Sequence, residues 1–177
     1  ARSNKDPRRS NTVVMTGGGP GIMEAANRGA FDTQAHTVGL NIDLPHEQFP
    51  NPYVTPGLCF RFHYFAMRKL HFMHRARALV AFPGGFGTFD ELFEILTLRQ
   101  TGKMGDDLPI ILFDKAFWQS AVNLDHLAET GMIHPDGDVC VDLVEIPLEH
   151  GEAFHIRSAR ADVERALECV SLRSDIV

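Results

Sequence analysis

The stretch ALVAF (Ala78–Phe82), followed by PGGFGTFDE (Pro83–Glu91), decides the fold of this chain. The first five residues are a continuous apolar run, which is typical of a strand buried inside a parallel sheet. A glycine-rich turn follows, and the amphipathic run Thr88–Thr101 predicts a helix. Strand, glycine turn and helix in this order form the repeating unit of an α/β fold.

The same unit recurs along the chain of 177 residues. Proline residues crowd Asp43–Gly57, which we expect to be a loop. The further predicted strands are Thr12–Met15, His36–Asn41, Pro109–Phe113 and Val139–Ile146, and the further predicted helices are Ile22–Phe31, Leu58–Arg77, turns between Asp114 and Thr130, and Ala159–Leu172. This alternation predicts a doubly wound (Rossmann-like) parallel sheet with helices on both faces, built as one nucleotide-binding domain over residues 1–177.

Composition excludes several classes of protein. Lys and Arg number 17 against 23 Asp and Glu, so the net charge is −6, which disfavours binding to nucleic acid. No apolar run is long enough to span a membrane, and residues 1–11 lack the apolar core of a signal peptide. The cysteines are three, without a C-x-x-C pair, which fits a reducing cytoplasm: Cys59, Cys140 and Cys169.

Two glycine loops follow predicted strands, where ligands of doubly wound sheets bind. Gly17–Gly21 is not a G-x-G-x-x-G fingerprint, because Ile22 stands at the sixth position. Both this loop and Gly84–Gly87 nevertheless place backbone N–H groups at a helix start, where an anion such as phosphate binds. Thr88 adds a hydroxyl group. The alternative is a pair of tight turns without a ligand.

Glu91 has two interpretations. Thr88-x-x-Glu91 matches a capping box, in which the glutamate bonds back to the backbone of the cap residue. A carboxylate beside an anion site is otherwise costly, which favours a separate chemical task for Glu91.

The predicted helix Leu58–Arg77 lies in a stretch without acidic residues from Gln48 to Phe89. Its arginines Arg61, Arg68 and Arg75 recur every seven residues and are expected on one helical face, as a solvated stripe or an anion site. The histidines of this segment (His63, His71 and His74) lack a metal-binding motif, so we expect no metal ion.

These residues resemble the LONELY GUY (LOG) family of nucleoside 5′-monophosphate phosphoribohydrolases, often labelled possible lysine decarboxylases. The family signature P-G-G-x-G-T-x-x-E stands complete over Pro83–Glu91. Its upstream glycine pattern is recognisable, one position off, in Gly17–Met23, and its Arg-Lys pair is Arg68-Lys69. The segments Asn51–Phe65 and Gln100–Lys103 look like the longer, bacterial type of this family. The resemblance is close over Thr12–Phe117 and looser beyond.

The resemblance implies hydrolysis of the N-glycosidic bond of AMP or a cytokinin riboside 5′-monophosphate, without a cofactor, in the manner of an AMP nucleosidase. It implies that Arg68 and Glu91 are catalytic, and that Gly84, Gly85, Gly87 and Thr88 hold the 5′-phosphate while Gly18, Gly19, Gly21 and Lys69 complete the binding site. Glu91 would stabilise the oxocarbenium character of the sugar and hold the attacking water. Lysine decarboxylation is not expected, because nothing local marks Lys69 as a pyridoxal-phosphate lysine.

One departure keeps an alternative open. Family members usually begin with a further strand, a Gly-Ser turn and a helix, which the chain from Ala1 does not show. Either that unit precedes Ala1 or part of the nucleotide pocket is absent, and the alternative function is then a non-catalytic nucleotide-binding or sensing module. The aromatic-rich segment Leu58–Met73 predicts a homodimer, or a larger homo-oligomer built from dimers.

Overall fold

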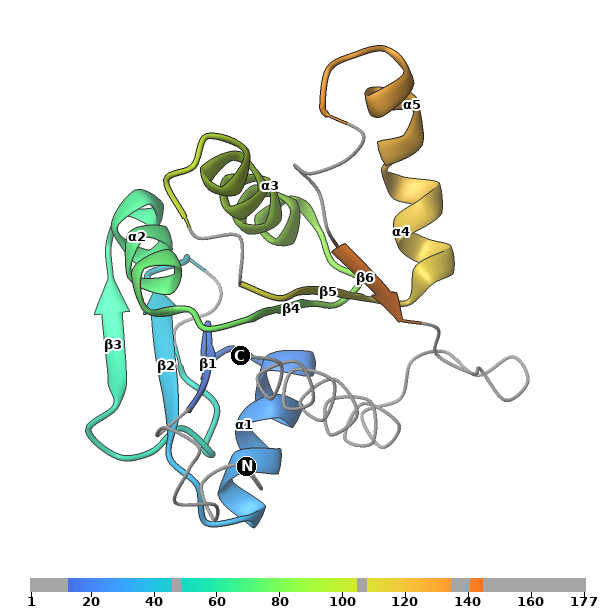
Figure 1. Cartoon of the computed structure of the whole chain (residues 1–177). Coiled ribbons are helices and arrows are strands. Elements are labelled where there is room, and N and C mark those ends of the chain that lie inside the picture. The colour runs from blue at the N-terminus through green and yellow to red at the C-terminus, as the bar shows by residue number, and fades with distance from the viewer. Residues whose placement is uncertain (1–12, 46–48, 105–107, 135–140, 145–177) are drawn as a thin grey trace, which may run out of the picture. The chain divides into compact units, whose positions relative to one another are not determined.

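The computed structural model describes residues 13–45, 49–104, 108–134 and 141–144 (Figure 1). The chain divides into two compact units, one containing the residues up to Arg75 and the other beginning at Ala76. Each unit holds a sheet of three parallel strands with helices packed against it. The predicted α/β class with parallel strands is therefore confirmed.

The first unit has strand order β1-β2-β3. Its elements are β1 (Val14–Thr16), α1 (Ile22–Asp32), β2 (Thr37–Ile42), β3 (Cys59–Phe62) and α2 (Phe65–Arg75). On one face of the sheet, Asn27 of α1 hydrogen-bonds to Thr37 of β2. On the other, the ring of Phe62 lies 5.0 Å from that of His71 of α2. Because side chains alternate along strands paired in this register, the two helices cover opposite faces of this sheet.

The second unit has strand order β4-β5-β6. Its elements are β4 (Leu79–Ala81), α3 (Phe86–Gln100), β5 (Ile110–Phe113), α4 (Lys115–Ala121), α5 (Leu124–Glu129) and β6 (Val141–Val144). The central strand β5 is the core, since every one of its residues is at most 2% exposed. The indole N–H of Trp118, itself buried, donates to the carbonyl of Phe113 over 2.8 Å and ties α4 to this strand.

The predicted helix over Leu58–Arg77 is wrong in its first third. Residues Cys59–Phe62 form β3, which pairs in parallel with β2, and α2 begins only at Phe65 (Figure 1). The absence of glycine and proline permits a helix but does not require one. Aromatic residues alternating along Cys59–Phe62 favour a strand once a partner is available, and that partner lies far away in the sequence. Arg61 therefore does not share a helical face with Arg68 and Arg75.

The start of α3 also differs from the prediction. The helix begins at Phe86 with Gly85 as its N-cap, so Thr88 lies inside the first turn. Neither Asp90 nor Glu91 is in that turn. The predicted helix Ala159–Leu172 lies outside the described residues. Within the described ranges, none of the helices combines the length and apolar character needed to cross a bilayer.

Candidate functional site

The first glycine loop joins β1 to α1 and is packed from two sides. A Cβ atom on Gly17 would lie 2.9 Å from the sulfur of Met23, and one on Gly19 would lie 2.7 Å from its Cε. Gly18 has φ +73° and faces β2, where its Cβ would stand 3.5 Å from Gly39 Cα. The positive φ thus favours glycine at position 18, and the side chain of Met23 fills the space beside Gly17 and Gly19. At the end of the loop, Gly21 (φ +71°) has no described atom within 4 Å of the corresponding position, so no described residue covers the backbone there.

A buried network of hydrogen bonds fixes the carbonyl groups of this loop. The backbone N–H of Asn51 donates to the Gly18 carbonyl over 2.7 Å, and its side-chain Nδ2 donates to the Gly19 carbonyl over 3.0 Å. The same Nδ2 reaches Asn27 Oδ1 at 2.9 Å, and the Thr16 hydroxyl donates to that oxygen at 2.7 Å. Asn27 is fully buried and Asn51 is 8% exposed. Neither asparagine was predicted from the sequence as a functional residue.

Arg68, one of the two predicted catalytic residues, reaches the first glycine loop. It is half-buried on α2, and its Nη1 lies 3.3 Å from the position of a Cβ on Gly17. Its guanidinium carbon is 5.5 Å from the ring centroid of Phe65 and 5.7 Å from that of Phe72, which is the range of cation–π contacts. These rings restrict where the guanidinium can stand. Lys69 follows on α2 and is also half-buried.

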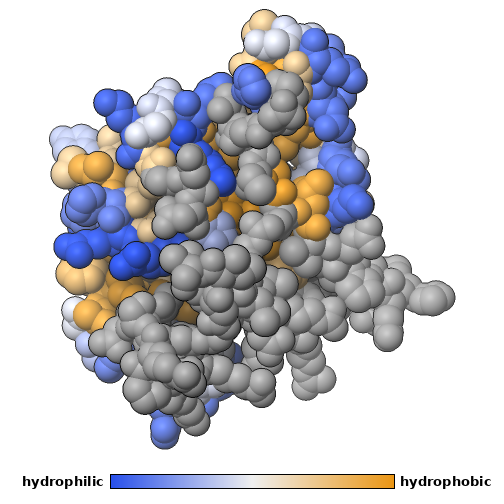
Figure 2. Space-filling model, viewed as in Figure 1, coloured by the Kyte–Doolittle hydropathy of each residue, from blue (hydrophilic) through white to orange (hydrophobic). Residues whose placement is uncertain are grey.

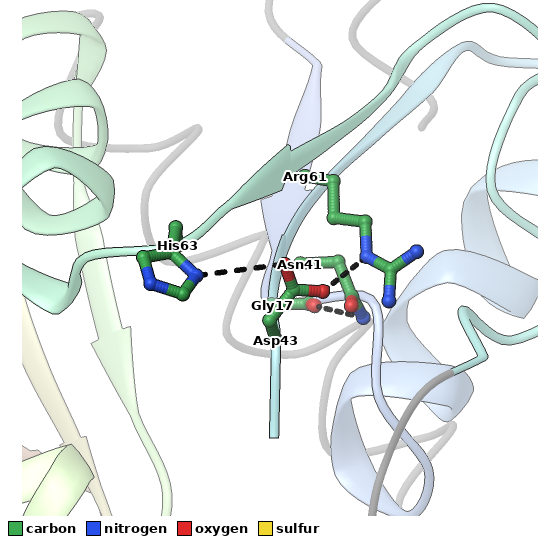
Figure 3. Close-up of polar contacts among 5 residues, drawn as sticks. All are labelled: Gly17, Asn41, Asp43, Arg61 and His63. Atoms are coloured by element: carbon green, nitrogen blue, oxygen red, sulfur yellow. Dashed lines mark hydrogen bonds and ion pairs between the residues drawn. The ribbon is translucent and has the colours of Figure 1, made fainter. Parts of the chain in front are cut away.

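The carboxyl ends of β2 and β3 carry a second polar cluster, shown in Figure 3. Arg61 Nε donates to Asp43 Oδ1, and His63 Nδ1 lies 4.0 Å from Asp43 Oδ2. Asn41 Nδ2 reaches the Gly17 carbonyl at 3.4 Å. Asp43 therefore pairs with the charge of Arg61. The sequence did not reveal this pair, because Asp43 lies before the stretch without acidic residues that contains Arg61.

The second glycine loop lies between β4 and α3, as predicted. A Cβ on Gly84 would stand 2.2 Å from the Thr88 hydroxyl oxygen, so Thr88 itself requires a glycine there. Gly85 and Gly87 are different. Both are exposed, neither has a positive φ, and no described atom lies within 4 Å of where their side chains would stand. Packing within the described residues therefore does not explain why these two positions are glycine.

Glu91 lies in the second turn of α3 and is half-buried. Because the N-cap is Gly85, without a side-chain cap bond, Thr88 is not the cap and the predicted capping box is wrong. A capping role therefore does not account for Glu91.

His71 Nδ1 contacts the Met67 carbonyl at 2.8 Å, one helical turn away on α2. In the part of the chain that the structure describes, no group of three or more His, Cys, Asp or Glu residues is placed to hold an ion.

The predicted site residues fall into two sets. Gly18, Gly19, Gly21, Arg68 and Lys69 belong to the first unit, and Gly84, Gly85, Gly87, Thr88 and Glu91 to the second. Contacts link Arg68 to the first loop and Thr88 to the second. That both sets serve one ligand stays a prediction.

Known proteins similar to this chain bear on what these loops are for. This chain is 28% identical over 131 residues to cytokinin riboside 5′-monophosphate phosphoribohydrolase LOG1 of Arabidopsis thaliana, and the match covers 72% of this chain and 59% of that protein. It is 24% identical over 156 residues to the probable cytokinin riboside 5′-monophosphate phosphoribohydrolase LOGL6 of Oryza sativa subsp. japonica, covering 87% and 61%. The matched regions thus span about three fifths of these relatives.

The family comparison covers both units. A family model described as possible lysine decarboxylase matches residues 23–150, which are 128 of the 177 residues. That range contains Arg68-Lys69 and the whole second glycine loop with Glu91. The chain therefore belongs to the possible lysine decarboxylase family, the LONELY GUY family that its glycine signature resembles.

Proposed function

We propose that this chain is a hydrolase of nucleoside 5′-monophosphates, cleaving the N-glycosidic bond to release a free base and ribose 5-phosphate. The substrate is AMP or a cytokinin riboside 5′-monophosphate. The names of its relatives, which are phosphoribohydrolases, support this reaction rather than decarboxylation of lysine.

One observation carries the proposal. Gly85 and Gly87 stand at the start of α3, exposed and with no described neighbour that excludes a side chain. Glycine within a helix costs about 0.5–1 kcal/mol relative to alanine, so Gly87 has a cost that the protein's own packing does not explain. A ligand that approaches the backbone closely explains it. The first N–H groups of a helix lack intrahelical acceptors and attract anions, which fits the 5′-phosphate.

Arg68 and Glu91 have the chemistry that the reaction needs. Departure of the base leaves positive charge on the sugar, which the Glu91 carboxylate stabilises while it holds the attacking water. Arg68, restrained by the rings of Phe65 and Phe72, engages the nucleotide through its guanidinium group. Restraint before binding lowers the entropic cost of that contact.

A product assay tests the proposal. Purified protein is incubated with AMP, and then with prenylated AMP, and adenine or its derivative is measured by chromatography. Glu91→Gln removes the charge of the proposed catalytic carboxylate, and Glu94→Gln is the matched control one turn further along α3. We expect product from the wild type and Glu94→Gln and none from Glu91→Gln.

The other outcomes decide between the alternatives. Full activity in a folded Glu91→Gln protein would disprove the role of that carboxylate. AMP binding by calorimetry without product, also in a chain extended upstream of Ala1, would favour the non-catalytic nucleotide-binding module. Absence of binding in both chains would refute the nucleotide site altogether.

A homo-oligomer built on a dimer is the second part of the proposal. The edge formed by β3 and α2 exposes Phe60, Phe65, Met67 and Leu70, each about half accessible. Figure 2 shows hydrophobic residues among hydrophilic ones on this side of the first unit. Leu70→Glu would place a charge in this surface, so we expect it to lower the mass measured by light scattering. A wild-type monomer at micromolar concentration would contradict the oligomer.

A further inference from the structure

We infer that Asn51, locked in place by Asn27, is a positioning residue that orients the first glycine loop for anion binding. The inference rests on the nucleotide-binding function proposed above. It concerns a residue from the connection between β2 and β3, 32 positions away from the Gly19 carbonyl that it binds.

Two carbonyl groups of the first glycine loop point toward Asn51. Asn51 binds the carbonyls of both Gly18 and Gly19, the one through its backbone N–H and the other through its side chain. Carbonyl oxygens carry partial negative charge and repel an anion. Because both are turned toward Asn51, the loop keeps its repelling groups on the inner side. The N–H that follows a carbonyl in a trans peptide points the opposite way, so the Gly19 N–H is turned away from Asn51.

The side-chain amides of Asn27 and Asn51 each have one permitted orientation. The Thr37 hydroxyl donates to the Val14 carbonyl over 3.0 Å, so it must accept the hydrogen bond from Asn27 Nδ2. Asn27 Oδ1 is then the acceptor that faces Asn51, which fixes Asn51 Nδ2 as the donor to Gly19. A buried network in which each group is satisfied in only one way is rigid.

The network leaves the end of the loop at α1 uncovered by described residues. Gly18 and Gly19 are buried, whereas a Cβ on Gly21, at the start of α1, would meet no described atom within 4 Å. Pro50, adjacent to Asn51, lies 3.9 Å from the position of a Cβ on Gly18 and supports the same side of the loop. The loop is thus fixed from within and accessible at its α1 end, where backbone N–H groups and the helix dipole favour negative charge.

Two substitutions at Asn51 test the inference. Asn51→Ala removes the side-chain bonds to Gly19 and Asn27 and the bond that Oδ1 accepts from the Tyr53 N–H, but it keeps the backbone bond to Gly18. Asn51→Asp keeps the shape of the side chain. It places a carboxylate oxygen opposite the two oxygens that Nδ2 binds in the wild type, the Gly19 carbonyl and Asn27 Oδ1. A loop that is no longer held in this orientation loses hydrogen bonds to the charged phosphate. We therefore expect AMP affinity, measured by calorimetry, to fall roughly tenfold to a hundredfold, and further for Asn51→Asp than for Asn51→Ala. In steady-state kinetics we expect KM to rise while kcat is nearly retained, because the loop binds the anion and does not contact the reacting bond.

Thr55→Val is the matched control. The Thr55 hydroxyl accepts a hydrogen bond from the Thr37 N–H over 2.9 Å, at the end of the network remote from the loop. This variant loses stability through the same network, so urea unfolding shifts for both Thr55→Val and Asn51→Ala. We expect the affinity of Thr55→Val for AMP to lie within about twofold of that of the wild type, well short of the tenfold loss expected at Asn51.

Each outcome is decisive. An Asn51→Ala protein that is folded and binds AMP as the wild type does overturns the inference alone. An equal loss of affinity in Thr55→Val also overturns it, since the effect would then be general destabilisation. A wild type that binds neither AMP nor inorganic phosphate, both as this chain and when extended upstream of Ala1, overturns the proposed function, and the inference with it.

Discussion

Replacing Gly87 by alanine should make the protein more stable and at the same time weaken its binding of nucleotide. Gly87 is the second residue of α3, with an exposed backbone and no described atom within 4 Å of the new methyl group. The folded structure therefore accommodates the methyl group without strain. The unfolded chain loses conformational freedom, which raises the free energy of unfolding.

The size of both effects follows from this geometry. Alanine in place of glycine stabilises a helical position by about 0.5–1 kcal/mol, with the smaller end expected in a first turn. A methyl group over the N–H groups at the helix start prevents a phosphate oxygen from reaching hydrogen-bonding distance. Loss of one hydrogen bond to a charged group costs about 1.5–3 kcal/mol, so affinity for AMP should fall roughly tenfold to a hundredfold.

Gly29 provides the matched control. It is the other glycine within a described helix whose Cβ position is free of described neighbours, and it lies near the end of α1, away from the first glycine loop. Urea unfolding should show a stability gain for both Gly29→Ala and Gly87→Ala, while calorimetry with AMP should show weaker binding for Gly87→Ala alone. Unchanged AMP affinity in Gly87→Ala would refute the argument that a ligand requires this glycine. A loss of stability would show instead that the protein's own packing requires it.

Three further predictions concern the second unit and the cysteine of β3. Gly84→Ala should destabilise the protein by about 1–3 kcal/mol in urea unfolding, because its methyl group would overlap the Thr88 hydroxyl; an unchanged midpoint would contradict that contact. Trp118→Phe should cost about 1–3 kcal/mol, measured by circular dichroism, because the buried Phe113 carbonyl loses its donor; a neutral result would show that another donor replaces the indole. Desolvation raises the pKa of the Cys59 thiol, so at pH 8 it should react with iodoacetamide more slowly than cysteine in an unfolded peptide, with the difference vanishing well above both pKa values; equal rates in peptide-resolved mass spectrometry would contradict this.

Local patterns in the sequence predicted most of the described elements. The apolar run before Pro83 is a strand and the amphipathic run after it is a helix, because both signals lie within a few neighbouring residues. The helix start was misplaced by two residues for a physical reason. Backbone hydrogen bonds from Thr88 and Phe89 to the Gly85 carbonyl set that start, and they compete with the capping preference of the threonine side chain.

Pairing over long distances could not be predicted in this way. β3 is a strand because β2 offers it a parallel edge, and nothing within Cys59–Phe62 specifies that partner. Asn27 and Asn51 are 24 residues apart, so their hydrogen bond arises only when α1 and the loop after β2 meet. One local signal existed: the buried face of α1 consists of Ala25, Asn27 and Ala30, and a lone asparagine among alanines indicates a buried polar partner.

The side chain of Met23 occupies the space that Gly17 and Gly19 leave free, so we expect the energetic effects of substitutions at these three positions to be coupled. An alanine at Gly17 or Gly19 requires the end of the Met23 side chain to move, and this movement becomes unnecessary once residue 23 is smaller. In a mutational scan of pairs, such substitutions would show strong positive epistasis. Distant homologues with a changed glycine motif are therefore better recognised when the residue six positions after the first glycine is considered together with it.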